Sequence, residues 1–132
     1  MSFLTGNQVL FSTTDLEIKE LVTRAQWPDN VEISFVEDVF DALFGETELP
    51  VYGCLIIDAE LKVIEEIRHL GIKLPILSLL SDASVGARIA VLEIGSDDCL
   101  GPSFSVSELV ARTQALCRRG ISVDRESRPA AG

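Results

Sequence analysis

The first half of this chain has almost no basic residues. Residues 1–60 contain two basic side chains, Lys19 and Arg24, against twelve acidic ones, whereas residues 61–132 contain nine of each. The formal net charge of −10 therefore comes from the first half. Because nucleic-acid backbones are bound chiefly through lysine and arginine, this balance argues against direct nucleic-acid binding by the chain. An acidic, solvated surface is the simplest interpretation of the excess.

Long apolar runs and targeting signals are also lacking. No stretch reaches membrane-spanning length, so we expect no membrane association, and residues 1–8 lack the basic segment of a signal peptide. The three cysteines, Cys54, Cys99 and Cys117, are an odd number without metal-ligand spacing. We therefore expect reduced thiols in a cytoplasmic protein. Cys54 and Cys99 are interpreted as small core residues rather than redox switches.

Motifs of independent catalysis are missing too. The sequence has no Ser-His-Asp or Cys-His arrangement, no glycine-rich phosphate loop and no metal-ligand cluster. Its single histidine, His69, falls on a polar helix face beside Arg68, where an unpartnered surface side chain is the simplest interpretation. We therefore predict that the chain is not an enzyme and carries neither a cofactor nor a metal ion.

The length and composition indicate one domain with a substantial core. The chain has 132 residues, of which 47% are hydrophobic. We assign residues 1–120 to this domain. Residues 121–132 are polar and are predicted to be a linker or disordered tail that leads to an effector domain.

Short apolar runs alternate with helical patterns along the chain. The runs predict strands at residues 9–11, 31–36, 52–58, 74–80 and 98–100. The run Tyr52-Gly-Cys-Leu-Ile-Ile-Asp58 shows no polar alternation, which is typical of a strand buried on both faces. It ends at a carboxylate. Because function collects beyond the carboxyl ends of parallel strands, Asp58 is the central candidate for a functional residue.

Five helical patterns fill the intervals between and after these runs. Thr14-Asp-Leu-Glu17 and Ser105-Val-Ser-Glu108 fit capping boxes that begin the first and last helices. We expect Gly45, Gly71, Gly95 and Gly120 to end the second to fifth helices, and Trp27-Pro28 to end the first. Val85, Ile89 and Leu92 mark the fourth helix. This alternation predicts an α/β fold with a five-stranded parallel sheet, doubly wound by helices on both faces.

Three segments of the second half carry a resemblance to a known family. They are Leu74-Pro-Ile-Leu-Ser-Leu, Leu92-Glu-Ile-Gly-Ser-Asp-Asp98 and Phe104-Ser-Val-Ser-Glu-Leu-Val-Ala-Arg112. They resemble the receiver domain of response regulators (CheY-like), above all the subfamily that carries a winged-helix DNA-binding domain (OmpR-like). The resemblance covers residues 8–119 in element order and is specific in the last third. It implies a flavodoxin-like sheet with strand order 2-1-3-4-5.

Receiver domains accept a phosphoryl group on the aspartate that matches Asp58. The resemblance also implies two acids at the end of the first strand that help to hold Mg²⁺, but these positions are Thr13 and Thr14 here. The family's switch hydroxyl, switch aromatic and lysine fall on Leu80, Cys99 and Pro102. The resemblance therefore implies an atypical, pseudo-receiver domain that regulates an attached or partner effector in transcription control without phosphorylation.

Other interpretations remain open. Asp15 would supply part of a metal site if Asp58 is a working phosphoacceptor of a two-component relay. A pocket near Asp58, Leu80 and Pro102 would hold a small ligand if the domain is a ligand or redox sensor. Thr14 is interpreted as a helix cap rather than a metal ligand, and Asp58 is equally compatible with capping backbone N–H groups at a strand end.

Charged residues of the last third match positions that the winged-helix subfamily uses for symmetric dimer contacts. The resemblance therefore implies a homodimer or another protein partner, such as a sensor kinase or an effector. In a twofold interface each acid–base pair counts twice, although ordinary solvated helix charges would give the same pattern. The residues are Arg88, Glu93, Asp97, Asp98, Glu108, Arg112, Arg118 and Arg119.

Overall fold

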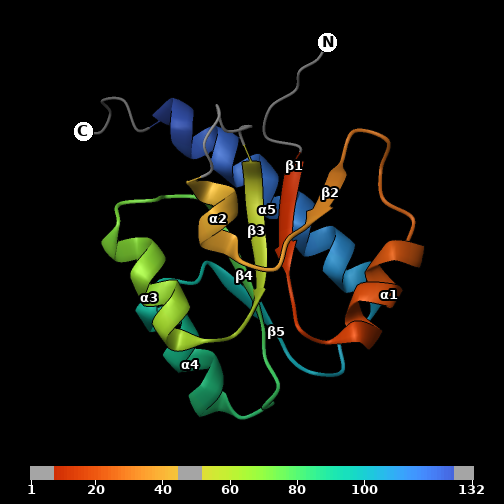
Figure 1. Cartoon of the computed structure of the whole chain (residues 1–132), viewed down its shortest axis with the longest axis horizontal. Coiled ribbons are helices and arrows are strands. Elements are labelled where there is room, and N and C mark those ends of the chain that lie inside the picture. The colour runs from red at the N-terminus through yellow and green to blue at the C-terminus, as the bar shows by residue number, and fades with distance from the viewer. Residues whose placement is uncertain (1–7, 45–51, 127–132) are drawn as a thin grey trace.

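The computed structural model describes residues 8–44 and 52–126, which form a five-stranded parallel sheet covered by helices on both faces (Figure 1). The strands lie side by side in the order β2-β1-β3-β4-β5. The flavodoxin-like class and its strand order are thus confirmed. The strands are β1 (Gln8–Ser12), β2 (Glu32–Phe35), β3 (Tyr52–Asp58), β4 (Ile76–Leu79) and β5 (Asp98–Leu100).

Five helices connect and follow these strands. Two of them, α1 and α5, cover one face of the sheet, while the other three cover the opposite face (Figure 1). Each face has its own apolar cluster, so the core consists of two layers separated by the sheet. The helices are α1 (Leu16–Arg24), α2 (Val39–Leu43), α3 (Leu61–His69), α4 (Val85–Ile94) and α5 (Val106–Glu126).

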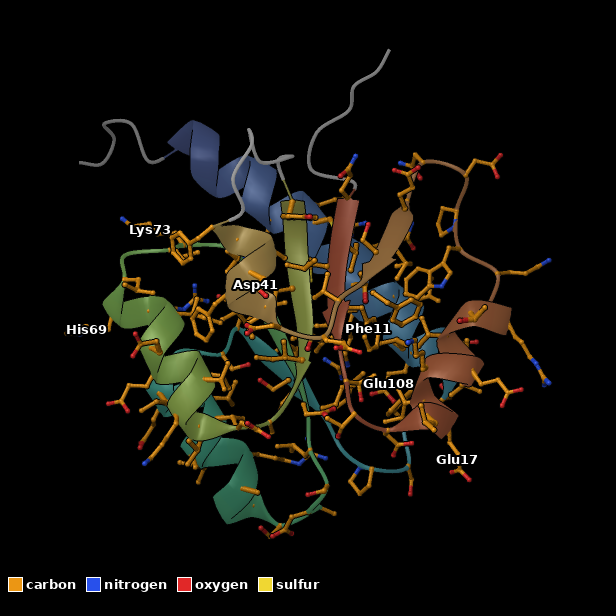
Figure 2. The ribbon with its side chains drawn as sticks, in the orientation of Figure 1. Phe11, Glu17, Asp41, His69, Lys73 and Glu108 are labelled. Carbon is orange, nitrogen blue, oxygen red and sulfur yellow. The ribbon has the colours of Figure 1, made fainter. Side chains whose placement is uncertain are left out.

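The central strand β3 is buried on both faces, as its uninterrupted apolar sequence predicts. Ile56 packs in the cluster beneath α1 and α5, and Ile57 packs in the cluster beneath α2, α3 and α4. Successive side chains of a strand point to opposite faces, so one strand contributes to both layers. Figure 2 shows Phe11 of the neighbouring strand β1 inside the molecule, with Glu17 and His69 on the outer sides of α1 and α3.

Two glycines follow helices where the prediction places them. The backbone φ angles are +84° at Gly71, after α3, and +131° at Gly95, which caps α4. Side chains with a Cβ rarely adopt these angles, so glycine ends both helices efficiently. The predicted stop at Gly45 lies outside the described residues.

The predicted end of the last helix at Gly120 is wrong, because α5 continues to Glu126. A single glycine in a helix costs only about 1 kcal/mol relative to alanine, too little to force an end. The predicted start of this helix is confirmed, since the Ser105 hydroxyl accepts a hydrogen bond from the Glu108 amide at 3.0 Å. Within residues 8–44 and 52–126, no helix combines the length and apolar character needed to cross a membrane.

Candidate functional site

Asp58 ends β3 and is held by two threonines from the end of β1. The Thr13 hydroxyl donates to Oδ1 of Asp58 at 2.8 Å. The backbone N–H and the hydroxyl of Thr14 donate to Oδ2 at 3.0 and 3.2 Å. Because β1 and β3 are adjacent parallel strands, their carboxyl ends meet at one edge of the sheet. Both carboxylate oxygens therefore accept hydrogen bonds from the positions where the family has acids.

The interpretation of Thr14 as the helix cap is wrong. Asp15 caps α1, because its Oδ1 accepts hydrogen bonds from the Glu17 and Ile18 amides at 2.9 and 3.2 Å. A carboxylate caps a helix at least as well as a hydroxyl and also interacts favourably with the helix dipole. Capping engages Oδ1 of Asp15, the residue expected to contribute to a metal site, and leaves Thr14 to contact Asp58.

The cavity beside Asp58 has a volume of about 170 Å³ and an acidic lining. Glu37, Asp38 and Glu60 line it together with Asp58, and none of the lysine, arginine and histidine residues that the structure describes does. The negative potential of four carboxylates opposes the approach of a phosphate group, which is itself an anion.

The side chains at this site do not fit the Mg²⁺ ion that phosphorylation of receiver domains involves. The Thr13 hydroxyl donates to Asp58 and accepts from the Asp15 amide at 3.0 Å, so it is engaged in both directions. Among the residues that the structure describes, no three His, Cys, Asp or Glu side chains converge to hold a metal ion. Mg²⁺ prefers an octahedral shell of oxygens that includes carboxylates. The carboxylates that line the cavity do not converge on one point, and threonines stand at the positions of the family's paired acids.

The other predicted pocket positions do not line the cavity of Asp58. Leu80 is buried in the apolar cluster beneath α2, α3 and α4, and Ser81 next to it is exposed. Cys99 and Pro102 line a separate cavity of about 200 Å³. There the Arg88 guanidinium lies 3.8 Å from the Cys99 Sγ atom. The cavities beside Asp58 and beside Pro102 are thus separate, and Leu80 lines neither of them.

Charged residues of β5 and α5 form a network within the chain. The Arg112 guanidinium contacts the Asp98 carboxylate at 2.9 Å and the Glu108 carboxylate at 3.2 Å. The hydrogen bond and charge of Asp98 raise the pKa of Arg112. Glu93 on α4 and Arg118 on α5 are exposed. The predicted dimer residues therefore include pairs that are already satisfied in one chain, and their role between chains stays a prediction.

Arg68, on α3, is an anchoring residue that the sequence did not reveal. Its guanidinium donates to the carbonyls of Gly95, Ile72 and Leu74 at 2.8–3.0 Å and to the Asp97 carboxylate at 2.9 Å. Burial lowers the pKa of Arg68, and the Asp97 charge opposes this change. Asp97 also lies 3.8 Å from Arg119. Asp97 therefore links α3, β5 and α5. It lies at the start of β4, whereas Asp58 lies level with the end of β4, at the opposite edge of the sheet. In the sequence, the only signal at Arg68 is its position just before the end of a helix.

The fourth helix turns an apolar stripe outward. Val85, Ile89 and Leu92 mark this helix in the sequence, but they are 69%, 49% and 44% exposed. The residues that α4 packs against the core are instead Ala87, Val91 and Ile94. The stripe residues lie at i, i+4 and i+7 and so occupy one side of the helix.

The 2-1-3-4-5 parallel sheet with a hydrogen-bonded aspartate at the end of its third strand places this protein in the flavodoxin-like α/β class, to which CheY-like receiver domains belong.

Comparisons with known proteins agree with this class. No family model matches the chain. It is 36% identical over 88 residues to the response regulator protein PmrA of Pseudomonas aeruginosa, covering 67% of this chain and 37% of that protein. It is 35% identical over 92 residues to the transcriptional regulatory protein TctD of Salmonella typhimurium, covering 64% and 41%.

A solved structure extends the agreement to the fold. The receiver domain of the Francisella response regulator 1452 superposes with a TM-score of 0.73 at 24% identity, covering 86% of this chain and 98% of that one. The chain is therefore a receiver domain of the response-regulator type. It spans only 37% and 41% of the length of the two curated relatives.

Proposed function

We propose that this receiver domain is a cytoplasmic, phosphorylation-independent module that signals through protein contacts and regulates an attached or partner effector in transcription control. It has no catalytic activity of its own in this proposal. The observation that carries it is the engagement of both Asp58 oxygens by Thr13 and Thr14. The effector is proposed because the relatives are described as response regulators and a transcriptional regulator.

Energetics favour an Asp58 that stays unmodified. A hydrogen bond to a charged acceptor contributes about 1.5–3 kcal/mol in a buried site, and less at a partly exposed one. Phosphorylation would remove charge from one Asp58 oxygen and displace at least one threonine donor. It would also place a phosphoryl group among the carboxylates of Glu37, Asp38 and Glu60, with no lysine at the Pro102 position to compensate.

The experiment is an amide NMR titration of the chain with Mg²⁺ and either acetyl phosphate or beryllofluoride. We expect the resonances near Asp58 and Leu80 to stay unchanged. The variant Thr13→Asp/Thr14→Asp/Pro102→Lys, which restores the missing groups, is the positive control and should show a Mg²⁺-dependent shift. A saturable, Mg²⁺-dependent shift in the wild type that Asp58→Ala abolishes would show that the domain is a working phosphoacceptor.

We further propose that the module associates weakly with a second copy through α4, β5 and α5. The stripe of Val85, Ile89 and Leu92 supplies exposed apolar area on α4, and β5 and α5 supply the charged network of Arg112. Exposed ion pairs contribute only about 0.2–1 kcal/mol each, so the stripe provides most of the affinity and the charges set the register. Because Leu80 and Cys99 replace the family's switch residues, association through this face does not require phosphorylation.

Sedimentation of the wild type at low and high salt tests the dimer. Arg112→Glu places a carboxylate beside Asp98 and Glu108 and should shift the chain toward monomer. Lys62→Glu makes the same change of charge on the exposed start of α3 and should leave association unchanged. A wild type that stays monomeric at high concentration under both conditions would defeat the homodimer and favour a different protein partner.

A further inference from the structure

One cavity lies between α4 and the segment that joins β5 to α5. Its volume is about 200 Å³, and it is separate from the cavity beside Asp58. Arg88 and Glu108 are the charged residues of its lining, and Pro102 and Phe104 contribute apolar groups. Sites for drug-sized ligands usually measure about 300–1,000 Å³, so this cavity suits a smaller molecule.

The two charged side chains of this cavity differ in their partners. The Glu108 carboxylate is paired with Arg112 at 3.2 Å. The Arg88 guanidinium forms no ion pair with a carboxylate among the residues that the structure describes. Its contact is with the Cys99 Sγ atom at 3.8 Å, and a thiol is only a weak acceptor for a group that has five N–H donors. Arg88 therefore brings an uncompensated charge and unused donors to the lining.

Gly101 allows the Arg88 guanidinium to lie close to the backbone at the end of β5. A Cβ atom added at Gly101 would lie 3.0 Å from Nη2 of Arg88, closer than most contacts of a Cβ atom. The guanidinium thus lies beside Cys99 and Gly101, at the wall of the cavity. Because Arg88 is exposed, a solute can reach its donors from the solvent.

We propose that this cavity binds a small carboxylate with an apolar body, whose oxygens accept hydrogen bonds from Arg88 and whose body packs against Pro102 and Phe104. The planar guanidinium matches the two oxygens of a carboxylate. Because an exposed ion pair contributes little by itself, the apolar body is needed for measurable affinity. The acidic lining around Asp58 repels the same ligand, so the two cavities differ in what they accept. The proposal does not depend on the state of Asp58 or on association of the domain.

An amide NMR titration of the full chain with benzoate tests the proposal. Benzoate joins one carboxylate to one ring, and benzamide is the neutral ligand of the same shape; sodium chloride is adjusted to keep the ionic strength constant. We expect saturable benzoate shifts at Cys99, Gly101 and Phe104, with half-saturation on the order of 1–10 mM for so small a ligand. Benzamide should bind roughly tenfold more weakly, because it offers Arg88 no negative charge.

Three variants, checked for folding by circular dichroism, assign the binding to Arg88. Arg88→Gln removes the charge and should weaken benzoate binding roughly tenfold while benzamide binding stays the same. Arg24→Gln is the matched control, because it makes the same substitution at an exposed arginine of α1 that pairs with Glu20, and it should bind benzoate as the wild type does. Gly101→Ala keeps the charge but displaces the guanidinium, and it should also weaken benzoate binding.

Three results would overturn the proposal. They are benzoate shifts that do not saturate in the millimolar range, equal binding of benzamide by the wild type, and wild-type affinity for benzoate in Arg88→Gln. Titrations at two protein concentrations separate ligand binding from self-association, because only self-association changes the spectrum of the unliganded chain with protein concentration. A chain that stays monomeric and still binds benzoate through Arg88 would refute the proposed dimer and support the carboxylate site.

Discussion

Replacement of Arg68 should destabilise the domain although this residue is far from Asp58. Arg68→Met keeps most of the apolar stem and removes the guanidinium, which donates to three backbone carbonyls and to the Asp97 carboxylate. The three carbonyls belong to the segments that follow α3 and α4. Their hydrogen bonds to one side chain hold the end of α3 against the end of α4.

The expected magnitude follows from the contacts and their exposure. Hydrogen bonds that involve a charged group contribute about 1.5–3 kcal/mol each, and breaking a buried ion pair costs about 3–5 kcal/mol. The Arg68 and Asp97 side chains are 23% and 29% exposed, so water rehydrates part of what the mutation leaves unpaired. Asp97 also keeps its hydrogen bond from the Ile76 amide at 2.8 Å. We therefore expect Arg68→Met to cost about 3 kcal/mol in total, a fall of roughly 10 °C in Tm.

Urea unfolding followed by far-UV circular dichroism measures this cost. Arg68→Lys should recover only part of it, because one ammonium group cannot reach four acceptors in the geometry of the guanidinium fork. Lys62→Met is the control, since it removes an exposed cation from the same helix and should change stability by less than about 0.5 kcal/mol. If Arg68→Met unfolds at the same urea concentration as the control, the assigned hydrogen bonds do not stabilise the fold.

Four further variants test other parts of the structure by the same unfolding assay. Ile56→Ala and Ile57→Ala should each cost about 2–5 kcal/mol, because these side chains are buried on opposite faces of β3; a near-neutral result for either would mean that one face of the sheet is exposed. Gly95→Ala should cost about 1–3 kcal/mol, since φ is +131° and an added Cβ would lie 2.6 Å from Cγ of Arg68; unchanged stability would show that this turn tolerates a side chain. Asp15→Ala should cost about 1 kcal/mol of stability through loss of the α1 cap, and unchanged stability would mean that another residue caps α1.

The sequence by itself determined the class of the fold and the position of its central carboxylate. Apolar runs that alternate with helical patterns predict a doubly wound sheet, and the bounds of β3 and β5 agree with the predicted runs. These features are local, because the spacing of apolar residues fixes which faces of a strand or helix are buried. The position of Asp58 at a strand end follows from the same pattern. The strand order came from the resemblance carried by the second half of the chain.

Local patterns were less informative where several residues fit one role. Thr14 and Asp15 both suit a helix cap, and the choice depends on Asp58, which lies more than forty positions away and attracts the Thr14 donors. The stripe of α4 has the helical spacing of a core face, but the spacing cannot say which side of the helix the sheet covers. Glycine often ends a helix, so Gly120 was a candidate for the end of α5. The helix nevertheless continues through Gly120, because one glycine is a weak signal.

The tertiary structure alone decided which distant side chains meet. Arg68 reaches Asp97 across 29 positions, and Thr13 reaches Asp58 across 45, because parallel strands bring segments of remote sequence to the same level of the sheet. No local pattern of residues along the chain predicts which of these distant side chains meet. The physical reason is that secondary structure follows from neighbouring residues, whereas long-range ion pairs and the acidic lining around Asp58 follow from how the finished elements pack.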